Sequence, residues 1–244
     1  MEVYLAEIFT HDNPDKSFLV CDMDLLPEFP DPLDVIYNVA WDYNGTNTDG
    51  IYAVGGLLSV TSLINGYMYG IFPWYPFRDE LVTWFCPKER YVIFPNEIHV
   101  SHSLRTLLNK NKYRVTFNEA FEEVVKNCSN VNGRFNDKNA WLGTELIEIY
   151  NRLHGLGIEE SVEVWEGDEL VGGLFGCYSN GVFQGESMFS IKPSGSKIAL
   201  VALARRLVLE GGKFIDVQIK APHFESMGGR YIDYREYRKL MDGC

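Results

Sequence analysis

The sequence lacks any long apolar run. No window approaches the roughly 20 uninterrupted apolar residues that a membrane-spanning helix needs, so we expect no membrane partner. The first residues, MEVYLAEIFT, lack the basic segment followed by an apolar segment that marks a secretory signal. We therefore expect a cytoplasmic protein.

Cysteine is also scarce. The chain has five cysteines, an odd number, with no C-x-x-C pair and no histidine at zinc-finger spacing. This excludes a disulfide framework and predicts reduced thiols that mostly fill the core. His99 and His102 are three apart, but without a third ligand nearby we expect surface or capping residues and no metal site.

Basic residues are nearly absent from the first sixty positions. Residues 1–60 contain eleven acids and a single base, Lys16. The rest of the chain is close to neutral, although the net charge of the whole chain is −12. Two later stretches lean basic, and acids interleave with them, which is typical of solvated faces. Their members are Lys88, Arg90, Arg105, Lys110, Lys112 and Arg114, then Arg205, Arg206, Lys213, Lys220, Arg230, Arg235, Arg238 and Lys239.

What the sequence does have is enough apolar content for a full core, with 46% hydrophobic residues over 244 positions. Its first part is turn-rich, with segments such as PEFPDPLD and DYNGTNTDG. We expect a small amino-terminal domain over residues 1–90 and a larger domain over residues 91–244.

Helix and strand patterns follow one another in a mixed order that indicates an α+β fold. Helix patterns cover residues 59–70, 103–110, 118–128, 144–154 and 194–210, with Asn118 as the expected cap of the third. Strand patterns cover residues 90–94, 113–117, 161–165, 170–178, 182–189 and 213–219. Asn180-Gly181 is a favoured two-residue hairpin turn, so the strands from 161 to 189 predict an antiparallel meander.

Two polar residues interrupt the last strand pattern. Asp216 and Gln218 are two apart among apolar neighbours, so we expect both side chains on one face of a mainly buried strand. Burying them is costly unless they are paired. A hydrogen-bonded pair that fixes the strand register and a catalytic role fit this spacing equally well.

A carboxylate lies in another apolar strand. Glu186 follows Gly185 in VFQGESMFS, and a glycine inside a strand often marks a bulge or the close approach of a ligand. A structural salt bridge to an arginine and a role in a site both remain open for Glu186.

Aromatic residues gather at expected loop or edge positions. They could form a stacking platform for a base, with core packing as the simpler alternative. These residues are Phe72, Trp74, Tyr75, Trp84, Phe85 and Trp141.

A set of segments matches a known pattern in order and in spacing. The segments are IYAVGGLLS, GIFPWY, WFCPKER, AWLGTELIEIYNRLHGLG, SVEVWEGDELVGGLFG, VFQGESMFS, SGSKIALVAL and GGKFIDVQ. From about Ile51 to its end the chain resembles the leucyl/phenylalanyl-tRNA-protein transferases, whereas residues 1–50 show no match. The tryptophan pair expected in that family is Trp84-Phe85 here, and Val217 replaces a cysteine.

The resemblance implies a small amino-terminal domain and a larger N-acetyltransferase-like domain with a mainly antiparallel sheet. It implies that Leu, Phe or sometimes Met moves from aminoacyl-tRNA to an acceptor protein with an amino-terminal Arg or Lys, which marks that protein for degradation. It implies no metal and no cofactor. An aminoacyl ester is already activated, so the enzyme has to supply orientation and stabilise the oxyanion.

The resemblance also implies the site. Asp216 is expected to polarise Gln218 so that it receives the proton of the attacking amine, or Gln218 only orients the amine while Asp216 or the ribose hydroxyl takes the proton. Glu186 would hold the substrate amine or the cationic end of the acceptor. The side-chain pocket would be formed by Leu174, Phe183, Leu203, Leu207 and Ile215, and the terminal adenosine would lie on Trp74 and Trp141.

Strand alternation sets a condition on this site. Phe183 and Glu186 face one substrate only if the strand has a bulge near Gly185. The two basic stretches would then be candidates to bind the tRNA acceptor stem.

Two other functions remain open. An acyl-CoA-dependent N-acyltransferase would share the fold, although residues 192–196 only weakly resemble a glycine turn that binds pyrophosphate. A non-catalytic RNA-binding module would leave Asp216, Gln218 and Glu186 with purely structural roles.

Overall fold

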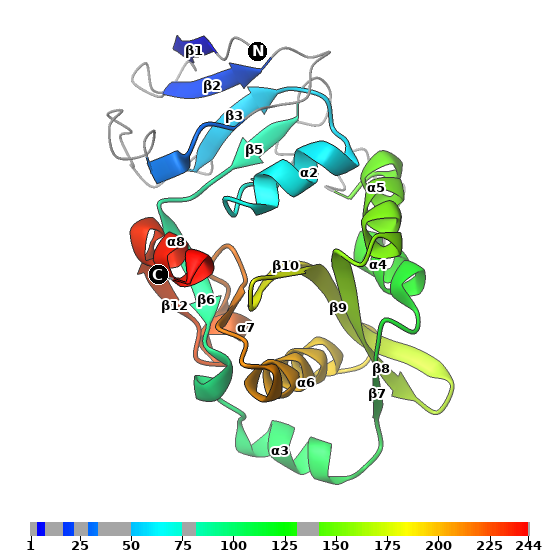
Figure 1. Cartoon of the computed structure of the whole chain (residues 1–244). Coiled ribbons are helices and arrows are strands. Elements are labelled where there is room, and N and C mark those ends of the chain that lie inside the picture. The colour runs from blue at the N-terminus through cyan, green and yellow to red at the C-terminus, as the bar shows by residue number, and fades with distance from the viewer. Residues whose placement is uncertain are drawn as a thin grey trace. The chain divides into compact units, whose positions relative to one another are not determined.

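The computed structural model describes residues 29–33, 50–74, 82–130 and 142–243, together with the backbones of residues 4–7 and 17–21 (Figure 1). The chain divides into two compact units. One comprises Met1–Glu89 with Asp233–Arg235, and the other comprises Arg90–Ile232 with Glu236–Cys244. The first unit thus takes in Asp233–Arg235, which the expected division at residue 90 assigned to the second domain.

The first unit is built on a five-stranded sheet in the order β1-β2-β3-β5-β4. Its strands are β1 (Tyr4–Glu7), β2 (Ser17–Cys21), β3 (Ile51–Gly55), β4 (Phe72–Pro73) and β5 (Thr83–Phe85). Helix α2 (Val60–Tyr67) begins where the sequence predicts, because Ser59 and Ser62 each accept a hydrogen bond from the other's backbone N–H, at 3.1 and 2.7 Å.

Aromatic side chains form the centre of the first unit. Trp84 is fully buried, its indole N–H donates to the carbonyl of Gly55 at 3.0 Å, and the ring of Phe29 meets it edge-on at 5.0 Å. Phe72 and Phe85 are also buried and stack at 6.0 Å. The hypothesis of an exposed stacking platform is therefore wrong for Phe72, Trp84 and Phe85, which are core residues.

The second unit contains a seven-stranded sheet in the order β12-β6-β11-β10-β9-β8-β7. Its strands are β6 (Glu89–Ile93), β7 (Arg114–Phe117), β8 (Glu159–Glu166), β9 (Glu169–Ser179), β10 (Val182–Ser190), β11 (Phe214–Asp216) and β12 (Arg230–Asp233). The predicted meander is confirmed as β8, β9 and β10, and β10 then pairs in parallel with β11. The α+β class with a mainly antiparallel sheet is confirmed.

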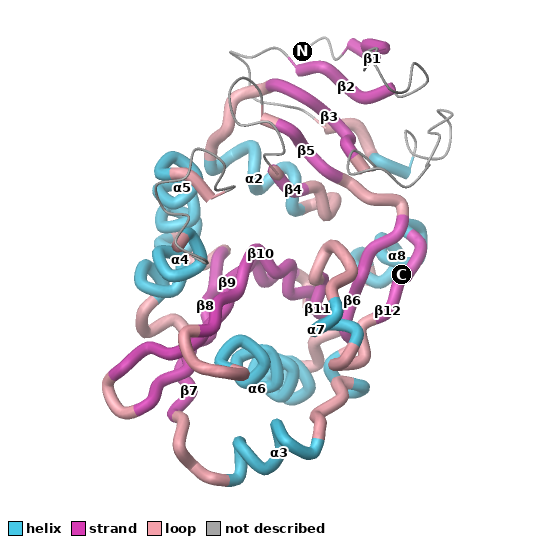
Figure 2. Tube along the Cα trace, turned by 180° about the vertical axis from the view of Figure 1, so that it is seen from behind, coloured by secondary structure: helices cyan, strands magenta, loops and turns pink. Residues whose placement is uncertain are grey.

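Helices pack on both faces of this sheet. Helices α4 (Phe121–Ser129), α5 (Thr144–Gly155) and α6 (Gly195–Glu210) contact its strands. The other helices are α3 (His102–Asn109), α7 (Pro222–Glu225) and α8 (Tyr234–Asp242), with a 3-10 turn η1 (Pro95–Glu97). Figure 2 shows α4 and α6 on opposite sides of β9. None of the helices in the described part of the chain is long and apolar enough to span a membrane.

Two consecutive glycines of β9, Gly172 and Gly173, explain how closely α6 and α4 approach the sheet. A Cβ on Gly172 would lie 2.5 Å from the backbone of Gly195 in α6, and a Cβ on Gly173 would lie 3.3 Å from the side chain of Val124 in α4. Neighbouring residues of a strand point to opposite faces, so the two helices lie on opposite faces. The backbone of α6 therefore contacts the sheet where no side chain fits.

Two local predictions are wrong. Asn118 does not cap α4, which begins after Ala120; it has a φ of +61° and its side-chain oxygen accepts the N–H of Ser161 at 2.8 Å. The last predicted strand is also too long, because β11 ends at Asp216 instead of continuing to Ile219.

Candidate active site

The carboxylate of Asp216 lies at the end of β11 and is fully buried. Its Oδ2 binds the guanidinium of Arg90 and accepts the hydroxyl hydrogen of Tyr237 at 2.9 Å. Its Oδ1 accepts the backbone N–H of Gln218 at 2.8 Å. Both oxygens of this carboxylate are therefore occupied by protein donors.

Arg90 compensates the buried negative charge. Only 1% of its side chain is exposed, and its guanidinium lies 4.7 Å from the ring centre of Tyr237. Moving two charges out of water is costly, and a buried pair persists when close contact and further hydrogen bonds offset that cost. Arg90, Asp216 and Tyr237 meet this condition together, although they come from β6, β11 and α8.

Gln218 follows the end of the strand in a left-handed conformation, with a φ of +63°. The expectation that Asp216 and Gln218 share one face of a strand is therefore wrong, because the hydrogen bond from the Gln218 N–H to Asp216 turns the chain first. The Gln218 carbonyl accepts from the N–H of Tyr91 at 3.2 Å. Its side-chain Nε2 donates to the carbonyl of Gly185 at 3.0 Å.

The bulge near Gly185 that the expected site requires is present in β10. Gly185 pairs with Gly176 and Ser187 pairs with Phe175, so Glu186 is the extra residue between them. Glu186 is half-buried, and its Oε2 accepts the hydroxyl hydrogen of Tyr150, from α5, at 2.8 Å. The bulge changes the strand phase between Phe183 and Glu186, as the expected site requires.

The structure thus brings the three expected reaction residues into one neighbourhood. Gly185 joins them, because its carbonyl receives Gln218 while Glu186 follows it in the chain, and a Cβ on Gly185 would lie 3.3 Å from the carbonyl oxygen of Asp216. Among the described residues, no hydrogen bond to the Oε1 of Gln218 is found. That oxygen can therefore accept a hydrogen bond from a substrate.

The expected apolar pocket residues lie in one hydrophobic cluster of the second unit. All five are at most 3% exposed, and the cluster packs β9, β10 and β11 against α6. They are Leu174, Phe183, Leu203, Leu207 and Ile215. Ile215 belongs to this cluster while Asp216 contacts α8, so the two lie on opposite faces of the sheet, as alternation predicts.

Only one of the two expected adenosine-binding tryptophans lies within the described residues. Trp74 is half-buried in the first unit, where its ring meets Phe85 edge-on at 5.2 Å. Trp141, like Tyr75, lies outside the described residues.

Several of the basic residues expected on a nucleic-acid surface are paired with acids. Arg90 is buried, so a surface role for it is wrong. The ion pairs found are Lys112–Glu166, Arg114–Glu119, Arg206–Glu160, Lys220–Glu225, Arg230–Glu97 and Arg238–Asp242. These pairs favour the interpretation of solvated faces with interleaved charges.

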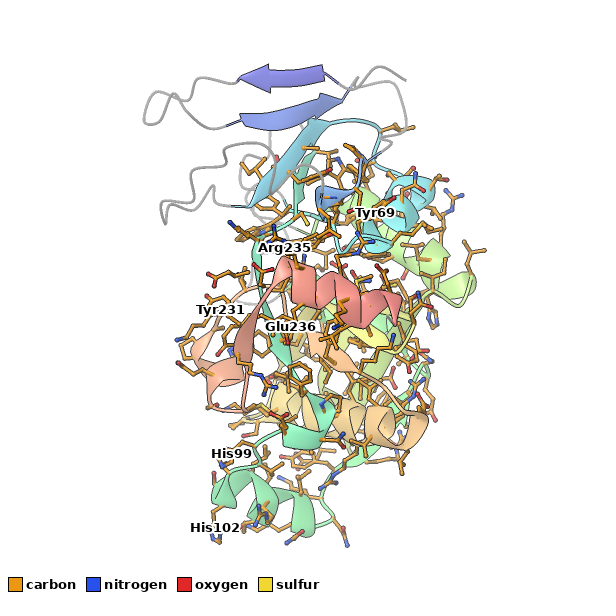
Figure 3. All side chains as sticks on the ribbon, turned by 60° about the vertical axis from the view of Figure 1, so that its left-hand side comes forward. Tyr69, His99, His102, Tyr231, Arg235 and Glu236 are labelled. Atoms are coloured by element: carbon orange, nitrogen blue, oxygen red, sulfur yellow. The ribbon has the colours of Figure 1, made fainter. Side chains whose placement is uncertain are left out.

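The two histidines near α3 are exposed (Figure 3). His99 places Nδ1 3.0 Å from the carbonyl of Ser226, and His102 is the first residue of the helix. Within the described ranges, no group of three or more His, Cys, Asp or Glu residues is arranged to hold a metal ion.

Sequence patterns did not single out Tyr150 or Tyr237, and they placed Arg90 on the surface. A signal for Arg90 existed, because it stands in an otherwise apolar strand, RYVIF, where a charge has to be paired. Tyr237 is three residues after Tyr234 and four before Met241, which is the spacing of a buried helix face. Neither pattern indicates that Arg90 and Tyr237 both bind Asp216.

Known proteins resemble the chain over most of its length. Residues 92–242 match the family Leucyl/phenylalanyl-tRNA protein transferase, and residues 56–88 match the Leucyl/phenylalanyl-tRNA protein transferase N-terminal domain. The leucyl/phenylalanyl-tRNA–protein transferase of Flavobacterium psychrophilum is 43% identical over 198 residues, 81% of this chain and 93% of that protein. The enzyme of that name from Syntrophobacter fumaroxidans is 44% identical over 193 residues, 79% of this chain and 82% of that protein.

Proposed function

The chain belongs to the leucyl/phenylalanyl-tRNA protein transferase family, and we propose that it moves a leucyl or phenylalanyl group from tRNA to the amino-terminal Arg or Lys of an acceptor protein. It is a transferase that uses aminoacyl-tRNA and a protein acceptor. We further propose that the transferred residue is Leu or Phe, that the acceptor begins with Arg or Lys, and that the transfer marks the acceptor for degradation.

The reaction forms one bond and breaks another. The α-amine nitrogen of the acceptor attacks the ester carbonyl carbon, a C–N bond forms, and the bond between that carbon and the ribose oxygen breaks. The amine loses a proton and the ribose hydroxyl regains one, so no cofactor is needed. The protein has to orient a neutral amine and stabilise the tetrahedral oxyanion.

Gln218 is proposed to orient the attacking amine. Its Nε2 is bound to the carbonyl of Gly185, which directs Oε1 as an acceptor for an amine N–H. A neutral amide is a very weak base, so in this proposal the proton passes to the departing ribose hydroxyl. Asp216 has both oxygens engaged, which supports a role in holding Gln218 in place.

Glu186 is proposed to bind the positive charge of the acceptor. It is half-buried on the bulge, and its Oε2 is fixed by the hydroxyl of Tyr150 at 2.8 Å. A carboxylate held in this way forms strong charge-assisted hydrogen bonds with a guanidinium or ammonium group. This is the basis for an amino-terminal Arg or Lys as the acceptor.

The hydrophobic cluster of the second unit is proposed to accept the side chain of the transferred residue. Its lining would be Leu174, Phe183, Leu203, Leu207 and Ile215, which pack together between the sheet and α6. An apolar pocket distinguishes side chains by about 1–3 kcal/mol per methylene, which supports selection of large apolar residues over small ones.

The tRNA is proposed to bind through its terminal adenosine and its backbone. Trp74 and Trp141 are the candidates for stacking on the adenosine, and exposed basic residues are the candidates for the acceptor stem. Charged tRNA is a cytoplasmic substrate, so a cytoplasmic place of action belongs to the same proposal.

A transfer assay tests the function. Labelled leucyl-tRNA, phenylalanyl-tRNA and, separately, acetyl-CoA are offered with otherwise identical peptides that begin with Arg, Lys or Ala. We expect label on the Arg and Lys peptides from both tRNAs and none from acetyl-CoA. Labelling from acetyl-CoA alone would favour the acyl-CoA-dependent alternative, and binding of tRNA without transfer would favour an RNA-binding module.

Variants of two glutamates test the acceptor site. Glu186→Gln should remove most of the preference for the Arg peptide over the Ala peptide. Glu97→Gln is the matched control, because Glu97 is an exposed acid that pairs with Arg230. An unchanged preference in Glu186→Gln would contradict the role of Glu186.

A further inference from the structure

The left-handed backbone of Gln218 has to be held in place by its surroundings. Its φ of +63° is unfavourable for any residue with a Cβ. The N–H of Gln218 donates to Asp216 at 2.8 Å and its carbonyl accepts from Tyr91 at 3.2 Å. The bond to Asp216 joins a backbone group to a charged side chain, which is the stronger type of hydrogen bond.

That hydrogen bond depends on how the carboxylate of Asp216 is oriented. Oδ1 accepts the N–H of Gln218 while Oδ2 is held by two donors, Arg90 and the hydroxyl of Tyr237 at 2.9 Å. Neither donor belongs to the segment that contains Asp216 and Gln218, since Arg90 is in β6 and Tyr237 is in α8. The side chains of Arg90, Asp216 and Tyr237 are at most 1% exposed. Water therefore cannot easily replace a lost hydrogen-bond partner, and losing one is costly.

We propose that Arg90 and Tyr237 are positioning residues for aminoacyl transfer. By fixing the carboxylate of Asp216, they hold the turn at Gln218 and so aim its side chain at the attacking amine. This inference relies on the role proposed for Gln218. It assigns Asp216 to the support of the turn, because its oxygens bind Arg90, Tyr237 and the Gln218 backbone, whereas the Gln218 side chain donates to the carbonyl of Gly185.

Tyr237→Phe is the most selective test of this role. It removes only the hydroxyl and keeps the ring, which packs 5.3 Å from the ring of Phe214 and 4.7 Å from the Arg90 guanidinium. We expect kcat to fall about tenfold, which corresponds to about 1.4 kcal/mol in the barrier, with the KM for each substrate within about twofold.

Tyr234→Phe is the matched control. Tyr234 is an equally buried tyrosine of α8, and its hydroxyl donates to the carbonyl of Tyr69 at 2.6 Å instead of to Asp216. We expect its kcat to stay within about twofold of the unsubstituted protein. An equal fall in kcat for both variants would overturn the proposal, because it would reflect general destabilisation.

A double-mutant cycle shows whether Tyr237 acts through Gln218. In a Gln218→Ala background, Tyr237→Phe should lower kcat by less than about twofold, because the side chain that the turn positions is already absent. A full tenfold loss in that background would mean that the two residues act independently, and the inference would be wrong.

Amide hydrogen exchange at Gln218 provides a measurement that does not need activity. Exchange of the Gln218 N–H should be about tenfold faster in Tyr237→Phe than in Tyr234→Phe, because the acceptor carboxylate loses a fixing donor. Equal exchange rates would overturn the inference even where Gln218→Ala is too slow to assay. Failure of the unsubstituted protein to transfer Leu or Phe would instead contradict the proposed function.

Discussion

Asp216 accepts the backbone N–H of Gln218 at 2.8 Å, and the side chain of Gln218 turns instead to the carbonyl of Gly185 at 3.0 Å. The pair is therefore connected through the main chain. This arrangement makes the strand end at Asp216 and sets the direction of the Gln218 side chain, and it leads to separate predictions for backbone and side chain.

The left-handed turn should distinguish glycine from alanine at position 218. Gln218→Gly and Gln218→Ala both remove the side chain, but only alanine keeps a Cβ that is unfavourable at a φ of +63°. We expect Gln218→Gly to be more stable than Gln218→Ala by about 1 kcal/mol in urea unfolding. Both variants should lose transfer activity to a similar extent. A more stable alanine variant would contradict the left-handed backbone.

Removing the buried carboxylate should be far more damaging than breaking an exposed ion pair. Asp216→Ala removes the carboxylate that pairs with the buried charge of Arg90, so we expect the free energy of unfolding to fall by about 3–5 kcal/mol. Arg230→Ala breaks the pair with Glu97, whose side chains are 47% and 55% exposed, and should cost less than about 1 kcal/mol. Urea unfolding of the two variants measures both values. Similar costs would mean that Arg90 finds another partner.

The hydroxyl of Tyr150 should matter for the acceptor and not for the tRNA. Tyr150→Phe removes the hydroxyl that donates to Glu186, so we expect kcat/KM for the Arg peptide to fall about tenfold while the KM for aminoacyl-tRNA stays within about twofold. Tyr52→Phe is the control, because that buried hydroxyl donates to the carbonyl of Pro30 at 2.7 Å. A larger change in the KM for aminoacyl-tRNA than in kcat/KM for the peptide would contradict the role of Glu186 in binding the acceptor.

Two buried thiols should resist alkylation in the folded protein. Burial raises the pKa of Cys128 to about 12 and raises the pKa of Cys177 well above its ordinary value, with Glu159 adding to the shift of Cys177. At about pH 8.5 an unfolded cysteine is half ionised, whereas these two remain protonated and unreactive. Mass spectrometry after iodoacetamide treatment, with and without urea, measures the label on each peptide.

The same shifts give a pH dependence of stability. Because both thiols have a higher pKa in the folded state than in the unfolded state, their contribution is complete below about pH 8.5 and is lost as the pH rises toward the folded value. We expect the urea midpoint to fall with pH above about 8.5 and to fall less in Cys128→Ser, whose hydroxyl does not titrate. An equal fall in both proteins would contradict the buried thiol as its cause.

Local patterns predicted the elements of the second unit well where the period was clear. Asn180-Gly181 and the alternation around it predicted the meander. Strand alternation only set a condition, a bulge near Gly185 if Phe183 and Glu186 are to face one substrate, and the structure has that bulge at Glu186. The turn at Gln218 escaped prediction because its cause is a side-chain-to-backbone hydrogen bond, and apolar alternation carries no sign of it. Packing decided the rest, since Trp84 and Phe85 look like loop aromatics and are core residues.

The ion pair of Arg90 and Asp216 also bears on how the protein folds. The two residues are 126 positions apart, so the chain between them has to close before the pair can form. Contacts between residues so far apart in sequence are slow to form, because the conformational entropy of a long loop is lost before the contact stabilises the chain. We therefore expect the meander to form first and the turn at Gln218 to become ordered only in the final folding step.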